Sequence, residues 1–157
     1  MNQTLVIPFQ LPTLNQMVQQ HRFTYAKLKI EYSEPVVLLA QAELVPIVEY
    51  PIMVHCHWFC ANTRSDPDNI AAGGKKLLLD ALQKARILSG DGWKQIIGFS
   101  DNFSKDPTRP RVEVKLESVG RSLWQAENLT RKDPSVAKAV GRSLGSERHE
   151  DRADTVQ

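Results

Sequence analysis

The chain has 157 residues, of which 41% are hydrophobic, and a formal net charge of +2 at pH 7. This length suffices for one domain with a substantial core, and the small net charge excludes a uniformly basic surface. Two unpaired cysteines, with no signal peptide or long apolar segment in the sequence, predict a cytoplasmic protein that does not contact a membrane.

The first third of the chain predicts a strand, a polar linker and a helix. The strand is expected over residues 4–9 and the linker, polar and mobile, over 15–25. The pattern over residues 25–43 is mostly helical, and Pro35 is expected to bend or break that helix because proline lacks the backbone donor.

The rest of the domain predicts a second helix among further strands. The β-α-β-α-β-β order indicates an α+β fold, with a single mixed β-sheet and two main helices. The last two strands are expected to form a hairpin with a long loop. Residues 1–119 form this domain, and the charged tail over 120–157 is interpreted as disordered or accessory, because it has few large apolar residues. The expected elements are a strand over 52–62, a helix over 67–86 and strands over 95–101 and 111–117.

Both cysteines lie in the predicted strand over 52–62, in a segment that also holds His55 and His57. Alternation places Cys56 and Cys60 on one face and the two histidines on the other. Cysteines four residues apart on a strand are separated by about 13 Å, which is too far for a disulfide and awkward for one zinc ion. We therefore expect reduced core cysteines and histidines that serve as strand side chains.

Asp66-Pro67-Asp68 opens the second predicted helix and has two interpretations. Aspartate is a favoured N-cap, proline fits the first helical position, and an acid in the first turn complements the helix dipole. The same carboxylates stay ionised easily at a helix N-terminus, and they are hard oxygen ligands that suit Mg²⁺. Both interpretations remain open from these residues alone.

Helical spacing then relates these acids to lysines and to a pair of glycines. Asp68 shares one side of the helix with Lys75 or Lys76, and Asp91 follows in a glycine-flanked turn. Each glycine costs about 1 kcal/mol in a helix relative to alanine. Close approach of another backbone, a partner subunit or a local kink would explain Gly73 and Gly74. An apolar stripe is expected at Ile70, Gly74, Leu77, Ala81 and Ala85.

The order of these motifs resembles that of the RusA family of Holliday junction resolvases (crossover junction endodeoxyribonucleases), in particular its phage and prophage members. The resemblance covers roughly residues 4–117. It rests on the segments Asp66-Pro67-Asp68-Asn69, Lys76-Leu77-Leu78-Leu79-Asp80-Ala81-Leu82 and Asp91, with landmarks at Leu11-Pro12-Thr13-Leu14-Asn15, Gly98-Phe99-Ser100-Asp101 and Pro110-Arg111-Val112-Glu113-Val114.

The resemblance implies a RusA-like fold and a site with defined roles. Asp66, Asp68 and Asp91 match the metal-binding aspartates, and Lys76 matches the active-site lysine. Residues 71–74 add a helical turn relative to the best-known form of the family, so Lys75 is the alternative lysine. The implied activity is paired phosphodiester hydrolysis in a four-way DNA junction by a homodimer with Mg²⁺, for which Mn²⁺ could substitute, and without an organic cofactor.

The distribution of charge supports DNA as the partner. Residues 64–115 hold ten basic residues against seven acids, three of which a metal would neutralise.

Asp101 is either a fourth acid near the site or a turn or strand-end residue. A nuclease for flaps or forks and a non-catalytic structure-selective DNA-binding module remain alternative functions. The expected DNA-binding residues are Arg22, Arg64, Lys75, Lys84 and Lys94.

Overall fold

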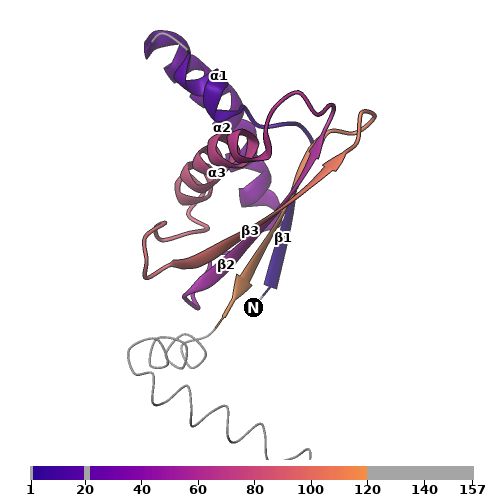
Figure 1. The fold of residues 1–157 in the computed structure, drawn as a ribbon. Coiled ribbons are helices and arrows are strands. Elements are labelled where there is room, and N and C mark those ends of the chain that lie inside the picture. Colours follow the sequence, from indigo (N-terminus) through magenta and orange to yellow (C-terminus); the bar gives the residue numbers. More distant parts are fainter. Residues whose placement is uncertain (1, 20–21, 120–157) are drawn as a thin grey trace, which may run out of the picture. The chain divides into compact units, whose positions relative to one another are not determined.

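The computed structural model describes residues 2–19 and 22–119, except for the side chains of residues 22–25. The predicted tail over 120–157 lies outside the described residues. The domain is α+β, with a four-stranded mixed sheet whose one face is covered by the helices (Figure 1). Its elements are β1 (Asn2–Ile7), α1 (Leu14–Val18), α2 (Arg22–Glu43), β2 (Ile52–Cys60), α3 (Pro67–Lys84), β3 (Ile96–Lys105) and β4 (Arg111–Ser118).

The strands are ordered β1-β4-β2-β3, so the predicted hairpin of the last two strands is wrong. β3 pairs in parallel with β2 after the crossover through α3, and β4 pairs antiparallel with β2 on the other side. The turn between β3 and β4 therefore passes the end of β2, where the Asp106 N–H donates to the Cys60 carbonyl at 2.8 Å.

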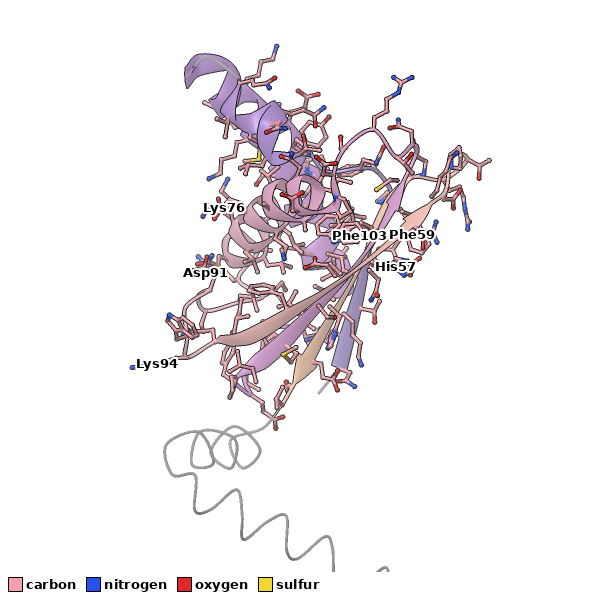
Figure 2. The ribbon with its side chains drawn as sticks, viewed as in Figure 1. His57, Phe59, Lys76, Asp91, Lys94 and Phe103 are labelled. Atoms are coloured by element: carbon pink, nitrogen blue, oxygen red, sulfur yellow. The ribbon has the colours of Figure 1, made fainter. Side chains whose placement is uncertain are left out.

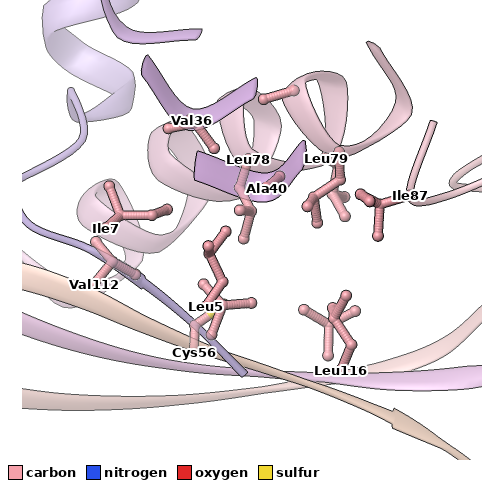
Figure 3. Packing of buried hydrophobic residues seen from close by; sticks show 14 of the residues in the cluster. Leu5, Ile7, Val36, Ala40, Cys56, Leu78, Leu79, Ile87, Val112 and Leu116 are labelled. Atoms are coloured by element: carbon pink, nitrogen blue, oxygen red, sulfur yellow. The ribbon is translucent and has the colours of Figure 1, made fainter. Parts of the chain in front are cut away.

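β2 shows the predicted alternation along its whole length. Every second residue is buried toward the helices, including Cys56, Trp58 and Cys60. Both cysteines are free and buried, which confirms the expectation of unbridged core residues. Leucine, isoleucine and valine side chains from the sheet meet those of α2 and α3 in one cluster, part of which Figure 3 shows.

α2 runs without a break through Pro35, contrary to the expected interruption. Pro35 is exposed, whereas Ser33, Val36 and Ala40 are buried against the core. Packing on both sides of the proline therefore holds the helix together in spite of the missing backbone hydrogen bond.

The segment expected to be a mobile linker contains α1, a helix of five residues. Thr13 caps it, and a reciprocal pair of bonds with Gln16 forms a capping box. Met17 is buried beneath the turn. The Thr-x-x-Gln spacing is a local signal for this helix, which the prediction of a mobile linker did not use. The buried Met17 side chain anchors the connection between β1 and α2.

α3 buries the predicted apolar stripe, except that Ile70 is only partly buried, and uses its glycines for close contact. A Cβ on Gly73 would overlap the backbone of residues 12–14, and one on Gly74 would overlap the Trp58 ring. The close approach of another backbone, one of the three explanations considered, accounts for Gly73. No helix in the described part of the chain is long and apolar enough to cross a membrane.

Replacing Gly73 with alanine should destabilise the protein by about 1–3 kcal/mol, because the clash with backbone atoms exceeds the gain in helix propensity. Urea unfolding followed by circular dichroism measures the difference. Ala72→Gly at the neighbouring exposed position is the matched control and should cost about 1 kcal/mol through propensity alone. A Gly73→Ala protein that is more stable than the parent would contradict the close approach.

Candidate functional site

Two of the predicted ligands lie at the start of α3. Asp66 is the N-cap, with φ −68° and ψ 145°, the extended conformation that a residue before proline favours. Its side chain makes no capping hydrogen bond, and Asp68 lies in the first turn. Both residues are exposed, so two carboxylates stand at the positive end of the helix dipole.

The third predicted ligand, Asp91, lies in the loop between α3 and β3 (Figure 2). Asp91 is exposed and borders a hollow of about 280 Å³ that is otherwise lined by Gly92, Trp93 and the first residues of β3. Two residues before it, the Ser89 N–H donates to the Tyr50 hydroxyl at 2.9 Å. The loop follows the C-terminal end of α3. Because Tyr50 precedes β2, this bond connects the loop to the start of β2.

The described part of the chain does not bring the three aspartates together into a metal-binding group. In the described part of the chain, no group of three or more histidine, cysteine, aspartate or glutamate side chains could hold a metal ion. α3 separates two of these acids from the third along the chain, and its 18 residues span about 27 Å. Asp66 and Asp68 lie at its start, and Asp91 belongs to the loop that leaves its end.

Between these ends, α3 contributes Lys75 to an ion pair with β3. The Lys75 Nζ lies 2.6 Å from Asp101 Oδ2 and 5.1 Å from the centre of the Phe99 ring. Asp101 Oδ1 accepts a bond of 2.9 Å from the Trp58 indole N–H. Asp101 therefore lies within β3, facing α3, which corrects the interpretation as a turn or strand-end residue.

Lys76, the lysine that the resemblance assigned to the site, lies beside α2. Its Nζ is 3.0 Å from Asp80 Oδ1, and Lys29 of α2 lies 2.6 Å from Asp80 Oδ2. Burial raises the pKa of Asp80, but hydrogen bonds from Lys29 and Lys76 outweigh this effect and leave the pKa below its usual value. Asp80 thus remains ionised between two lysines, and the Lys76 side chain is 57% exposed.

The other predicted DNA contacts are spread along α3 and its flanks. Arg64 is exposed just before the helix, and Lys94 is exposed in the loop after it. Lys84 in the last turn donates to Ser33 of α2 at 3.4 Å. Arg22 begins α2, and its side chain lies outside the described part.

The sheet face opposite the helices carries the two histidines, alongside Phe59 (Figure 2). His55 contacts the Ser100 hydroxyl at 2.7 Å and the Glu117 carboxylate at 3.1 Å, and His57 contacts the Ser104 hydroxyl at 2.8 Å. These partners confirm the expectation that the histidines are strand side chains.

A second cavity was not anticipated from the sequence. It has a volume of about 280 Å³ and lies between the connection from β1 to α1, the end of β2 and the start of α3. The capping-box spacing of Thr13 and Gln16 is a signal for an ordered connection there, which the prediction of a mobile linker overlooked, but it gives no sign of a cavity. Its polar lining includes Gln10, Thr13, Gln16, Tyr32, Asn62 and Ser65.

The structure defines an α+β domain with exposed carboxylates at the start of α3 and in the loop that follows it, and with a lysine–aspartate pair between α3 and β3. No known protein-family model matches the chain, and no curated protein matches it. The function is therefore argued from these residues and their positions.

Replacing Lys75 with methionine should cost about 1–3 kcal/mol of stability, because Asp101 is mostly buried and would lose its charged partner. Lys76→Met is the matched control, and because Lys76 is exposed its loss should cost about 1 kcal/mol or less. Urea unfolding at pH 7 gives both values. Equal losses for the two lysines would show that the Lys75–Asp101 contact does not stabilise the fold.

Proposed function

We propose that this protein is a Mg²⁺-dependent endodeoxyribonuclease that resolves four-way DNA junctions as a homodimer. The observation that carries the proposal is the pair of exposed carboxylates of Asp66 and Asp68 at the start of α3, the first of which makes no capping hydrogen bond. The RusA-like order of motifs around them supplies the substrate class, since acids, a metal and a lysine are the components of phosphodiester hydrolysis.

The donor chemistry of the three aspartates fits a hard divalent cation, Mg²⁺ or in its place Mn²⁺. When bound, the ion would polarise the scissile phosphate and lower the pKa of a water molecule. Both Asp66 and Asp68 are exposed, so a cation in solvent can reach their carboxylates.

The separation of the acids within one protomer supports a site shared by two. Asp66 and Asp68 lie at one end of α3, and Asp91 follows the other end. A two-fold axis repeats every residue, so the start of one helix can meet the loop that follows the other. In this arrangement Asp66 and Asp68 act with Asp91 of the partner subunit, and the two resulting sites match the two strands of a junction that are cut.

Lys75 is better placed than Lys76 to stabilise charge on the phosphate. Its ammonium group lies over Phe99, which also borders the hollow beside Asp91. Lys76 is instead held by Asp80 on the side of α2. Asp101 accepts from Lys75 and keeps its ammonium on the β3 side, so Asp101 is a positioning residue in this proposal.

The described residues of one chain contain no set of three or more side chains that could bind a metal ion. This observation favours one alternative function, a non-catalytic DNA-binding module. Such a module would bind a four-way junction by its shape and phosphates but would not cut it. The experiments below distinguish the two functions.

Asp68→Asn should abolish cleavage of a synthetic four-way junction in Mg²⁺, with a loss of about 10³-fold or more, because the metal loses a charged ligand. Junction binding in Ca²⁺ should survive. Denaturing gels resolve the cut strands, beside linear duplex and flap DNA. Glu31→Gln, an exposed acid on α2, is the matched control and should cut normally. A parent protein that binds the junction but never cuts it would leave the binding module as the function.

Mixing Asp68→Asn with Asp91→Asn subunits tests the shared site in the same assay. Random assortment makes half of the dimers mixed, and each mixed dimer then has one site with both carboxylates intact. Nicking should recover to about a quarter of the wild-type rate. Sites contained within single chains would remain inactive in every mixture.

Lys75→Gln should lower the cleavage rate by about 10²–10³-fold with little change in junction binding, because a charge that acts in the transition state is lost. Lys76→Gln is the control and should cut within a few-fold of the parent. Single-turnover rates are compared at a temperature where circular dichroism shows both variants folded. The reverse ranking would assign the role to Lys76, as the resemblance alone does.

A further inference from the structure

We propose that the cavity between the β1–α1 connection, the end of β2 and the start of α3 binds an unpaired nucleobase of the DNA. This inference rests on the proposed function and deepens it. The connection to the site is direct, because Ser65 lines the cavity and immediately precedes Asp66. A base held here would belong to a nucleotide close to the phosphate that is cut.

Every residue that lines the cavity except Arg111 is uncharged, which favours a base over a phosphate. The Arg111 guanidinium lies 3.5 Å from the centre of the Phe59 ring, on the sheet face opposite the helices. There it donates to Asp106 at 2.8 Å and to Glu113 at 2.7 Å. The charge of Arg111 is thus paired with two carboxylates outside the cavity.

This pairing persists over a wide range of pH. Hydrogen bonds from the Thr108 hydroxyl and the Arg109 N–H hold the pKa of Asp106 at about 2. Glu113 and Asp106 in turn raise the pKa of Arg111. Both partners of the ion pair therefore stay charged near neutral pH, and Arg111 is not released to bind a phosphate in the cavity.

The polar groups of the cavity offer both donors and acceptors. Gln16 uses its side-chain oxygen for the capping box, which leaves its amide N–H groups available. Asn62 likewise uses its oxygen to accept from the Arg64 N–H at 3.0 Å. The Ser65 and Tyr32 hydroxyls make no hydrogen bond with other residues in the described part of the chain. Amides and hydroxyls side by side are the groups that read the mixed donor and acceptor edge of a base.

The walls and volume of the cavity also suit a flat heterocycle. Trp58, Tyr32 and Ile70 supply aromatic and aliphatic surface. The Trp58 ring is fixed by Gly74 on one side and by its bond to Asp101. A volume of about 280 Å³ is near the lower end of small-molecule pockets, the size expected for one base rather than a whole nucleotide chain. Bases at the exchange point of a four-way junction can unstack, so they are available to enter.

The test uses junctions that carry 2-aminopurine, a fluorescent adenine analogue, at single positions around the exchange point, with binding in Ca²⁺. Wild type should change the fluorescence at one position in each cut strand. Gln10→Leu removes a lining amide, and Ser65→Tyr fills the mouth of the cavity. Both should abolish the change and weaken junction binding about tenfold. Gln41→Leu and Thr63→Tyr, at exposed positions that do not line the cavity, are the matched controls and should behave as wild type.

Titration of ¹⁵N-labelled protein with free deoxynucleosides gives a second readout. Backbone signals of residues around the cavity should shift with a deoxynucleoside and not with inorganic phosphate. A wild type that cuts junctions while neither fluorescence nor signals respond would overturn the base pocket alone. A wild type whose cavity binds deoxynucleosides, but which neither binds nor cuts junctions, would overturn the proposed function alone.

Discussion

The close approach of α3 to the sheet is the contact on which the other features depend. Gly73 admits the backbone of residues 12–14 against the helix, and Gly74 admits the Trp58 ring. With Trp58 pressed against the helix, its indole N–H reaches Asp101, and Asp101 receives Lys75. The same contact closes one wall of the cavity beside Ser65. Larger residues at the two glycine positions would lift α3 from the sheet and separate these groups.

Charged side chains of the domain differ in whether they are paired with an opposite charge. Asp80 is held between Lys29 and Lys76, and Arg111 lies between Asp106 and Glu113. Asp66, Asp68 and Asp91 are exposed instead, and the N-cap carboxylate makes no bond to its own helix. Exposed carboxylates keep their hydration and carry little desolvation cost, so the fold does not require a charged partner for these three aspartates.

Local features of the fold were predictable, because they depend on spacing along the chain. The alternation of β2 and the buried stripe of α3 follow from periods of two and 3.6 residues, and the start of α3 follows from the Asp-Pro pair. The break at Pro35 was predicted wrongly because burial of Val36 and Ala40 overrides the local penalty. Pairing of β4 with β2 was missed because partner strands distant in sequence leave no local signal.

The sequence by itself determined which residues are acids, where α3 begins and which faces of β2 and α3 are apolar, since these properties need only neighbouring residues. Only the tertiary structure decided that the described part of one chain does not gather the three aspartates into a metal-binding group, and that Lys75 rather than Lys76 faces Asp101. A lysine's partner depends on which strand packs across the helix, and that choice is made by the whole core rather than by helical spacing.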